Sequence, residues 1–198
     1  MTINTNFLIY EIIAAVVAIT IHGFVKAFVS SSLGDPLPKR DKRVTLNPIR
    51  HIEPIGLIIM IAFGFGWSKP VENAPIYYKD KRKGTILTYT IAPIVCLLFG
   101  VIIFTIRIII DAPSEVQTLL WTIAFFNIRH AFFNIIPIYP LDGAKVLSAL
   151  RGPNQVVKMV NSQMFMQFAL VLAVLWGLAS RLIDPIVFAI FGFIWQIF

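Results

Sequence analysis

At residues 18–28 the chain reads Ala-Ile-Thr-Ile-His-Gly-Phe-Val-Lys-Ala-Phe, and this stretch closes an apolar run that begins at Phe7. As a helix, a run of this length spans the hydrocarbon core of a bilayer, which is about 30 Å thick. His22 and Lys26 stand four residues apart, so a helix brings both side chains to one face. The sequence therefore predicts a first membrane helix over residues 6–28 that carries two polar side chains near its end.

The composition agrees with a membrane protein. Of 198 residues, 58% are hydrophobic and only 14% are charged, which excludes an ordinary soluble domain. The net charge of +7 does not predict a nucleic-acid partner here, because basic loops in a membrane protein mark its cytoplasmic side. Cys96 is the one cysteine, so the chain forms no internal disulfide.

Further apolar runs predict the remaining helices. We expect membrane helices over residues 86–110, 118–137 and 163–182, and a short final helix over 186–198. Asp184-Pro185 predicts the turn between the last two. The fold class is therefore an all-α polytopic membrane protein with a single domain over residues 1–198.

Residues 55–67 are apolar but reach only about 20 Å as a helix, less than the bilayer core. The loops on either side, 34–53 and 68–85, are both basic. A full crossing would place these basic loops on opposite sides, whereas a re-entrant segment keeps both on one side. We therefore predict a re-entrant segment over residues 55–67.

A second polar stretch runs Asn134-Ile135-Ile136-Pro137-Ile138-Tyr139-Pro140-Leu141-Asp142-Gly143. In the predicted topology the first helix and the helix over 118–137 end on the same side of the membrane. His22 and Asp142 therefore reach a similar depth, within meeting distance.

Together the two stretches resemble the site-2 protease family of intramembrane zinc metalloproteases. That family pairs H-E-x-x-H with N-x-x-P-x-x-x-L-D-G, and the second motif matches fully. Segments 33–36, 46–56 and 64–71 look like the small bacterial members. The resemblance covers about residues 15–152. It implies a core of three helices with a re-entrant loop region and two C-terminal membrane helices, in a bacterial plasma membrane with the site and basic loops cytoplasmic.

The first motif departs from the family at the positions that carry its chemistry. The resemblance assigns His22 and Asp142 as zinc ligands, but Gly23 stands at the general base and Lys26 at the second His. An ammonium has no lone pair for zinc, and glycine has no side chain to take a proton from water. His51 and His130 are poor replacements, since His130 lies about 18 Å from Asp142 if the segment is helical. We therefore expect no cofactor, where the active family has zinc.

Lys26 has two interpretations. Its ammonium takes the vacant metal position and pairs with Asp142, because buried charges in a membrane bundle find partners. Alternatively, it snorkels to the interface and pairs with nothing specific.

Other polar and glycine positions are candidates for contacts. In the family, the segment Gly64, Phe65, Gly66, Trp67, Ser68, Lys69 and Pro70 lies beside the active site and guides the substrate. Its alternative role is a structural loop that Trp67 anchors at the interface. Asn127 and Asn134 fit the family's helix pattern and are expected to hydrogen-bond across helices. Arg129 and His130 lie mid-helix, where we expect contacts with Glu11 or a partner helix.

Three functions remain open. The first is a catalytically inactive relative that binds a transmembrane segment or a membrane-protein partner in a regulatory or scaffolding role. The second is an active intramembrane peptidase, with non-standard metal ligands or with Ser30 and Lys26 as a metal-free pair. The third is a small transporter or proton relay that uses the intramembrane charges. Its candidate residues are His22, Lys26, Arg129, His130 and Asp142.

Overall fold

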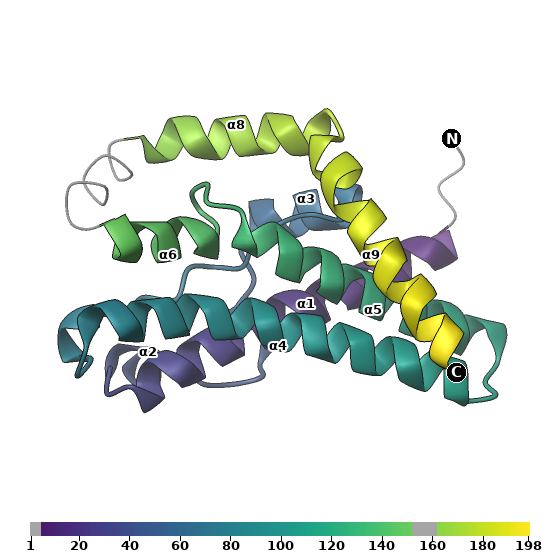
Figure 1. Ribbon diagram of the computed structural model, residues 1–198, viewed down its shortest axis with the longest axis horizontal. Coiled ribbons are helices and arrows are strands. Elements are labelled where there is room, and N and C mark those ends of the chain that lie inside the picture. The colour runs from purple at the N-terminus through teal and green to yellow at the C-terminus, as the bar shows by residue number, and fades with distance from the viewer. Residues whose placement is uncertain (1–4, 152–161) are drawn as a thin grey trace.

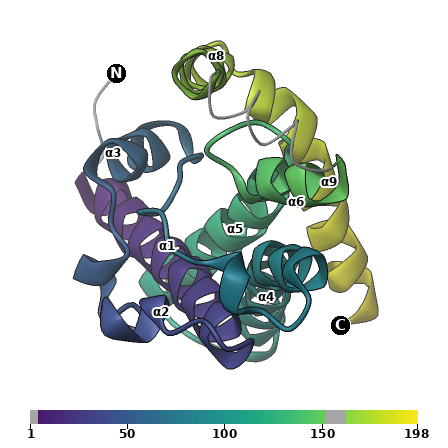
Figure 2. The same cartoon turned by 90° about the vertical axis from the view of Figure 1, so that its left-hand side faces the viewer.

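Three long helices form the body of the protein. The computed structural model describes residues 5–151 and 162–198, and these residues form helices and loops without a strand. α1 (Thr5–Ser32), α4 (Lys81–Ile109) and α5 (Ser114–Ile135) run side by side along the long axis, as Figure 1 shows. The end-on view shows α5 enclosed by the other elements (Figure 2).

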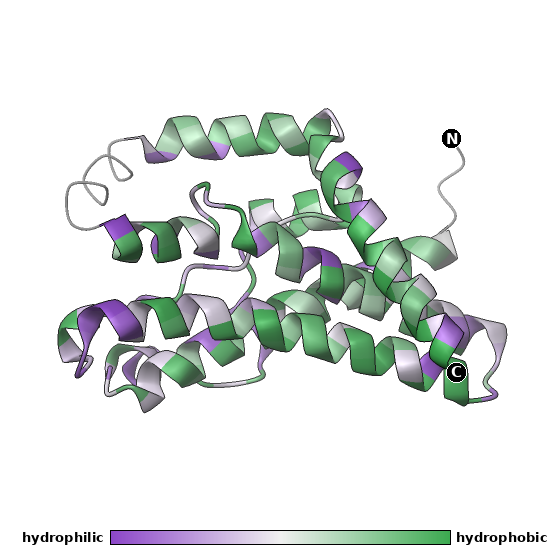
Figure 3. Ribbon diagram, in the orientation of Figure 1, coloured by the Kyte–Doolittle hydropathy of each residue, from purple (hydrophilic) through white to green (hydrophobic). Residues whose placement is uncertain are grey.

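The fold class is confirmed as an all-α polytopic membrane protein. In the described part of the chain, three helices are long and apolar enough to cross a membrane: Phe7–Ser32, Lys81–Ile109 and Leu178–Ile197. Many large apolar side chains stay exposed on these helices. In Figure 3 the ribbons of α4, α8 and α9 are coloured mostly green, for hydrophobic residues. α5 differs because it buries polar side chains at Asn127, Arg129, His130 and Asn134 inside the bundle.

Small residues bring the long helices close together. A Cβ atom at Gly100 of α4 would lie 2.9 Å from the Ala124 carbonyl oxygen and 2.6 Å from the Ile128 side chain of α5. Ala14, Ala15 and Ala18 of α1 are fully buried. Backbones in a membrane bundle approach this closely only where side chains are small.

The segment predicted to be re-entrant contains a short helix, α3 (Pro54–Phe63), which at ten residues reaches about 15 Å. Glu53 caps its start by accepting hydrogen bonds from the Ile55 and Gly56 backbone N–H groups. Gly64 ends it with φ +76°, and the chain then returns, so that the Lys69 N–H donates to the His51 carbonyl at 2.8 Å. This helix is too short to cross, as predicted.

Shorter elements complete the end of the molecule that holds the second motif. They are α2 (Leu37–Arg40), η1 (Pro48–Arg50), η2 (Pro75–Tyr77) and α6 (Asp142–Arg151). α6 was not predicted, because the prolines at 137 and 140 indicate only where the preceding helix ends.

The predicted boundaries of the last two helices are wrong. The structure has α8 (Gln163–Leu175) and α9 (Leu178–Ile197), with the break at Gly177 and not at Asp184-Pro185. Gly177 has φ +71°, which glycine adopts without strain, and α9 continues through Pro185. α8 reaches only about 20 Å, so residues 163–182 do not form one full crossing. α8 and α9 together lead from the α6 end to the end where α4 connects to α5 (Figure 1).

Candidate functional site

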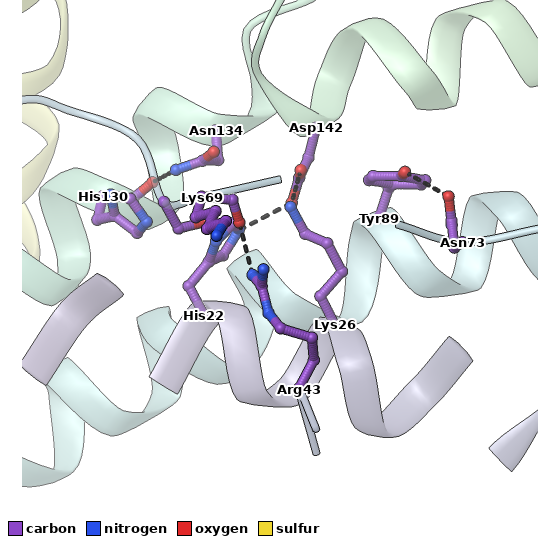
Figure 4. Close-up of polar contacts among 10 residues, drawn as sticks. His22, Lys26, Arg43, Lys69, Asn73, Tyr89, His130, Asn134 and Asp142 are labelled. Carbon is purple, nitrogen blue, oxygen red and sulfur yellow. Dashed lines mark hydrogen bonds and ion pairs between the residues drawn. The ribbon is translucent and has the colours of Figure 1, made fainter. Parts of the chain in front are cut away.

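The centre of the site is the carboxylate of Asp142, which meets two side chains from α1. Its Oδ2 lies 2.8 Å from His22 Nε2, and its Oδ1 forms an ion pair with the Lys26 ammonium (Figure 4). All three side chains are buried, with 1%, 6% and 2% exposure for His22, Lys26 and Asp142. The predicted Lys26–Asp142 ion pair is therefore confirmed, and Lys26 does not snorkel.

The local sequence explains how Asp142 returns to α1. α5 ends at Ile135, and Pro137 and Pro140 follow in the turn before α6. Gly143 makes the return possible, because a Cβ atom there would lie 2.0 Å from the Ile135 carbonyl oxygen. Burial alone would raise the pKa of Asp142, but the Lys26 ammonium and His22 outweigh it and hold that pKa below its usual value.

His130 lies at the site, contrary to prediction. Its ring meets the His22 ring edge-on, with 4.7 Å between centroids. The 18 Å estimate assumed one continuous helix from His130 to Asp142, whereas the chain reverses after Ile135 and brings Asp142 back beside His22. His130 is fully buried. Neither ring nitrogen meets the distance and angle of a hydrogen bond to a described residue, although the Gly66 backbone lies close enough to interact with the ring.

His51 fills the space that a side chain at position 23 would need. A Cβ atom on Gly23 would lie 2.3 Å from His51 Nδ1 and 2.9 Å from its Cγ. His51 Nε2 lies 2.7 Å from the Thr45 carbonyl oxygen, so Nε2 carries the hydrogen and Nδ1 is left with a lone pair and no partner. Burial lowers the pKa of His51, which keeps the ring neutral.

A pocket of about 340 Å³ opens beside the Lys26–Asp142 pair. Four of the residues predicted to form a partner groove, Trp67, Ser68, Pro70 and Asn134, are among those that line it, together with Lys145. Beyond Pro70 the wall continues through Val71, Glu72 and Asn73, and no backbone N–H of these three residues donates to a described residue. The pocket therefore has free backbone N–H groups on a non-helical segment beside a buried ion pair.

The other groove residues have structural roles. Phe65 packs against Phe133 with 5.3 Å between ring centroids. A Cβ atom on Gly66 would lie 2.1 Å from the Gly56 carbonyl oxygen, so glycine lets this segment approach α3. The side chain of Lys69 is exposed, and its carbonyl oxygen accepts a 2.8 Å hydrogen bond from Arg43.

The prediction for the two asparagines is wrong. Asn127 Nδ2 donates to the Ile123 carbonyl and Asn134 Nδ2 to the His130 carbonyl, each at 2.8 Å and within α5. Each side chain finds an acceptor one turn back along its own helix, so neither hydrogen-bonds across helices.

Arg129 pairs with α9 and not with Glu11. Its Nε and Nη2 lie 2.7 Å and 2.6 Å from the two oxygens of Asp184. The guanidinium also lies over the rings of Phe65 and Phe125, 4.4 Å from each centroid. Sequence reasoning missed Asp184 because Asp-Pro is a turn signal, although an acidic residue in an apolar stretch is itself a signal for a buried partner.

The proposed Ser–Lys pair is absent from the structure. Ser30 Oγ donates to Asp35 Oδ2 at 3.0 Å and lies 2.8 Å from Tyr78 Oη, while Lys26 pairs with Asp142. Lys26 also lies 5.2 Å from the centroid of the Tyr89 ring, whose hydroxyl donates to Asn73 at 3.0 Å.

The sequence profile of Peptidase family M50 matches residues 5–175 of this chain. The chain belongs to this family, the site-2 proteases. The family assignment made from the two motifs is therefore confirmed, and α9 lies beyond the matched range.

Two curated M50 relatives are similar to this chain. "Putative zinc metalloprotease YwhC" of Bacillus subtilis (strain 168) is 28% identical over 165 residues, covering 79% of this chain and 75% of that protein. "Zinc metalloprotease MJ0392" of Methanocaldococcus jannaschii is 25% identical over 81 residues, covering 41% of this chain and 24% of that protein. No solved structure gives a significant match.

Both relatives are named as zinc metalloproteases, so the side chains of this M50 chain that could ligate a metal are compared with a zinc site. Within residues 5–151 and 162–198, no group of three or more His, Cys, Asp or Glu side chains is arranged to hold a metal ion. His22 and Asp142, which the sequence resemblance predicts as two zinc ligands, contact each other in the structure, and the Lys26 ammonium contacts the same carboxylate.

Proposed function

We propose that this protein is a catalytically inactive M50 member that binds a transmembrane segment or membrane-protein partner in a regulatory or scaffolding role. The observation that carries the proposal is the ion pair between the Lys26 ammonium and Asp142 Oδ1. The basic loops at the end that holds the site favour a cytoplasmic position for it in a bacterial plasma membrane.

The ion pair does not fit a catalytic zinc. Such a site takes three protein ligands and keeps a fourth position for water. Here Oδ2 of Asp142 contacts the His22 imidazole and Oδ1 contacts the Lys26 ammonium. The same ammonium takes the place proposed for the third metal ligand. An ammonium has no lone pair to offer a metal ion. We therefore expect the purified protein to carry no stoichiometric zinc.

The residue at the predicted general-base position, Gly23, is a second and independent reason to propose an inactive site. Family chemistry needs a carboxylate that accepts a proton from water. Gly23 has no such group, and the His51 ring takes up the space where its side chain would begin. Both changes remove steps of peptide hydrolysis, whereas neither removes the pocket beside Asp142.

The pocket supports a binding role. Its wall over residues 71–73 lies outside any helix, and the backbone N–H groups there donate to no described residue, so we propose that an unwound peptide pairs with this segment as a strand. Trp67, Tyr89 and Tyr139 supply apolar surface, and Lys145 supplies a charge on the rim. We propose that the partner enters here as an unwound part of a membrane segment.

Metal analysis and crosslinking together test the proposal. Zinc is measured on the purified protein beside a His22→Ala control, with no zinc expected in either. A photoreactive residue at the exposed Glu72 position should then crosslink an intact membrane protein in cells, whereas one at Met164 on α8, 86% exposed, should not. Near-stoichiometric zinc that His22→Ala removes, or a partner recovered as cleaved fragments, would overturn it.

One observation favours a second function, an active metallopeptidase with non-standard ligands. His130 lies edge-on to His22 with 4.7 Å between the ring centroids, which makes it the nearest imidazole that a rearrangement of the site could add to His22 and Asp142 as a third donor. This function requires zinc that is lost in His130→Ala. It still lacks the carboxylate at position 23, for which reason the inactive protein is preferred.

A further inference from the structure

A second pocket, of about 600 Å³, adjoins the segment that lines the first. Pro70 and Glu72 line both pockets. Most of its other lining residues belong to the loop between α2 and α3, and neither His22 nor Lys26 lines it. Its lining residues are Asp41, Arg43, Asn47, Ile49, Arg50, Lys69, Pro70 and Glu72.

Arg43 is the buried charge of this pocket. Its side chain is 7% exposed, and its Nη2 donates to the Lys69 carbonyl oxygen at 2.8 Å (Figure 4). Its Nε is buried and has no hydrogen-bond partner among the described residues. A buried guanidinium N–H without an acceptor is costly, so this group is suited to an acceptor that comes from outside the chain.

The charges around Arg43 favour an anion. Arg50 and Lys69 line the same pocket with exposed side chains. The pocket also contains Asp41 and Glu72, but Arg40 pairs with Asp41 at 2.9 Å and offsets its charge. A phosphate oxygen accepts from guanidinium and ammonium groups together, and arginine is the residue best suited to it.

From its position along α1, we infer that the pocket lies near the depth of lipid headgroups. His51, next to Arg50, packs against Gly23, which stands about 24 Å along α1 from Phe7, close to the limit of a core about 30 Å thick. Leu46 and Ile49, in the loop that forms the pocket, are 63% and 78% exposed. Apolar side chains exposed beside basic ones at this depth are typical of a surface that contacts lipid.

We propose that the pocket formed by Arg43, Arg50 and Lys69 binds the phosphate of a phospholipid headgroup. Arg43 gives its unpaired Nε–H, and Arg50 and Lys69 close over the phosphate from the rim, while Leu46 and Ile49 contact the acyl region. The bound lipid holds the loop of residues 41–50 against the segment of residues 69–72, which also forms the first pocket. This inference does not depend on whether the M50 site is active.

Lipid-dependent thermal stability of the detergent-purified full chain tests the proposal. The probe is dioctanoyl phosphatidylglycerol, compared at equal concentration with dioctanoylglycerol, sodium phosphate and glycerol 3-phosphate. The variant Arg50→Gln/Lys69→Gln removes two exposed charges and leaves the buried Arg43 in place. Its matched control is Lys81→Gln/Lys83→Gln, which removes two exposed charges outside the pocket at the start of α4.

We expect the phospholipid to raise the unfolding midpoint of the wild type and of the control pair at similar concentrations. The pocket pair should need about tenfold more lipid, because each lost charge-assisted contact weakens binding. If the pocket pair and the control pair needed the same increase in lipid concentration, the lipid would be attracted to the basic surface in general, and the proposal would be overturned. Equal stabilisation by dioctanoylglycerol would overturn the role of the phosphate, and equal stabilisation by either soluble phosphate would overturn the lipid as its source.

Discussion

Gly23 packs so closely against His51 that a side chain at position 23 would collide with the imidazole ring. The imidazole of His51 lies where the first side-chain atom of any other residue at position 23 would be, 2.3 Å from the ideal Cβ position. The motif H-E-x-x-H has a glutamate at the position that Gly23 is predicted to take, so under the proposed function the missing base and the position of His51 belong to one arrangement. Restoring the glutamate alone would displace His51 from its hydrogen bond to Thr45.

Gly23→Ala tests this arrangement. We expect it to destabilise the protein by about 2 kcal/mol, because an added methyl group overpacks the contact with His51. In a His51→Ala background the same change should cost little, so that a double-mutant cycle on unfolding midpoints in detergent gives a large coupling. The matched control is Gly192→Ala in α9, where a Cβ atom meets nothing within 4 Å. A Gly23→Ala variant as stable as Gly192→Ala would contradict the packing.

Lys26→Met tests the ion pair at the site. The change leaves the buried Asp142 with His22 as its remaining partner, and an uncompensated buried charge costs about 3 kcal/mol. Adding Asp142→Asn should recover part of the loss, since it removes that charge. Chemical unfolding of the three proteins in detergent measures both effects, with Lys81→Met at an exposed position as the control. An unchanged stability for Lys26→Met would remove the observation on which the proposed function rests.

Arg129→Gln tests the link between α5 and α9. We expect a loss of about 3 kcal/mol, because Asp184 loses both hydrogen bonds and Phe65 and Phe125 lose the cation between them. Asp184→Asn should be milder, since the amide oxygen still accepts from Arg129. Limited proteolysis and unfolding in detergent measure the stability of both variants. If Asp184→Asn and Arg129→Gln both left stability unchanged, the pair would not hold α9 to the bundle.

Acid should destabilise the protein through His51. Burial lowers its pKa in the folded state below the usual 6.5, so below pH 6.5 the unfolded chain binds a proton that the folded chain does not. The contribution of His51 to the free energy of unfolding is therefore constant above pH 6.5. Below that pH it falls, by at most about 1.4 kcal/mol per pH unit. Unfolding midpoints between pH 8 and 5.5 should fall less steeply for His51→Gln than for the wild type. Parallel curves would contradict this assignment.

The sequence predicted contacts that follow from regular geometry. Helical spacing placed His22 and Lys26 on one face, and the order of crossings brought Asp142 to their depth. It did not predict the His51 contact with Gly23, because a loop packing on a helix depends on tertiary structure that no local pattern contains. It also misjudged Asp184-Pro185, where the local turn signal is outweighed by the buried guanidinium of Arg129 that Asp184 meets across the bundle.

Lys26→His separates metal binding from catalysis. The new imidazole stands four residues after His22 on the same helical face, and removal of the ammonium frees Asp142 Oδ1. The variant therefore regains the three ligands of the family's zinc site, and we expect about one zinc per chain, lost again when His22→Ala is added. It should still cleave no transmembrane substrate in detergent, because Gly23 provides no base. Failure to bind zinc would mean that His22 and Asp142 are not positioned as ligands, whereas cleavage by the single variant would mean that another group, with His51 first to examine, serves as the base.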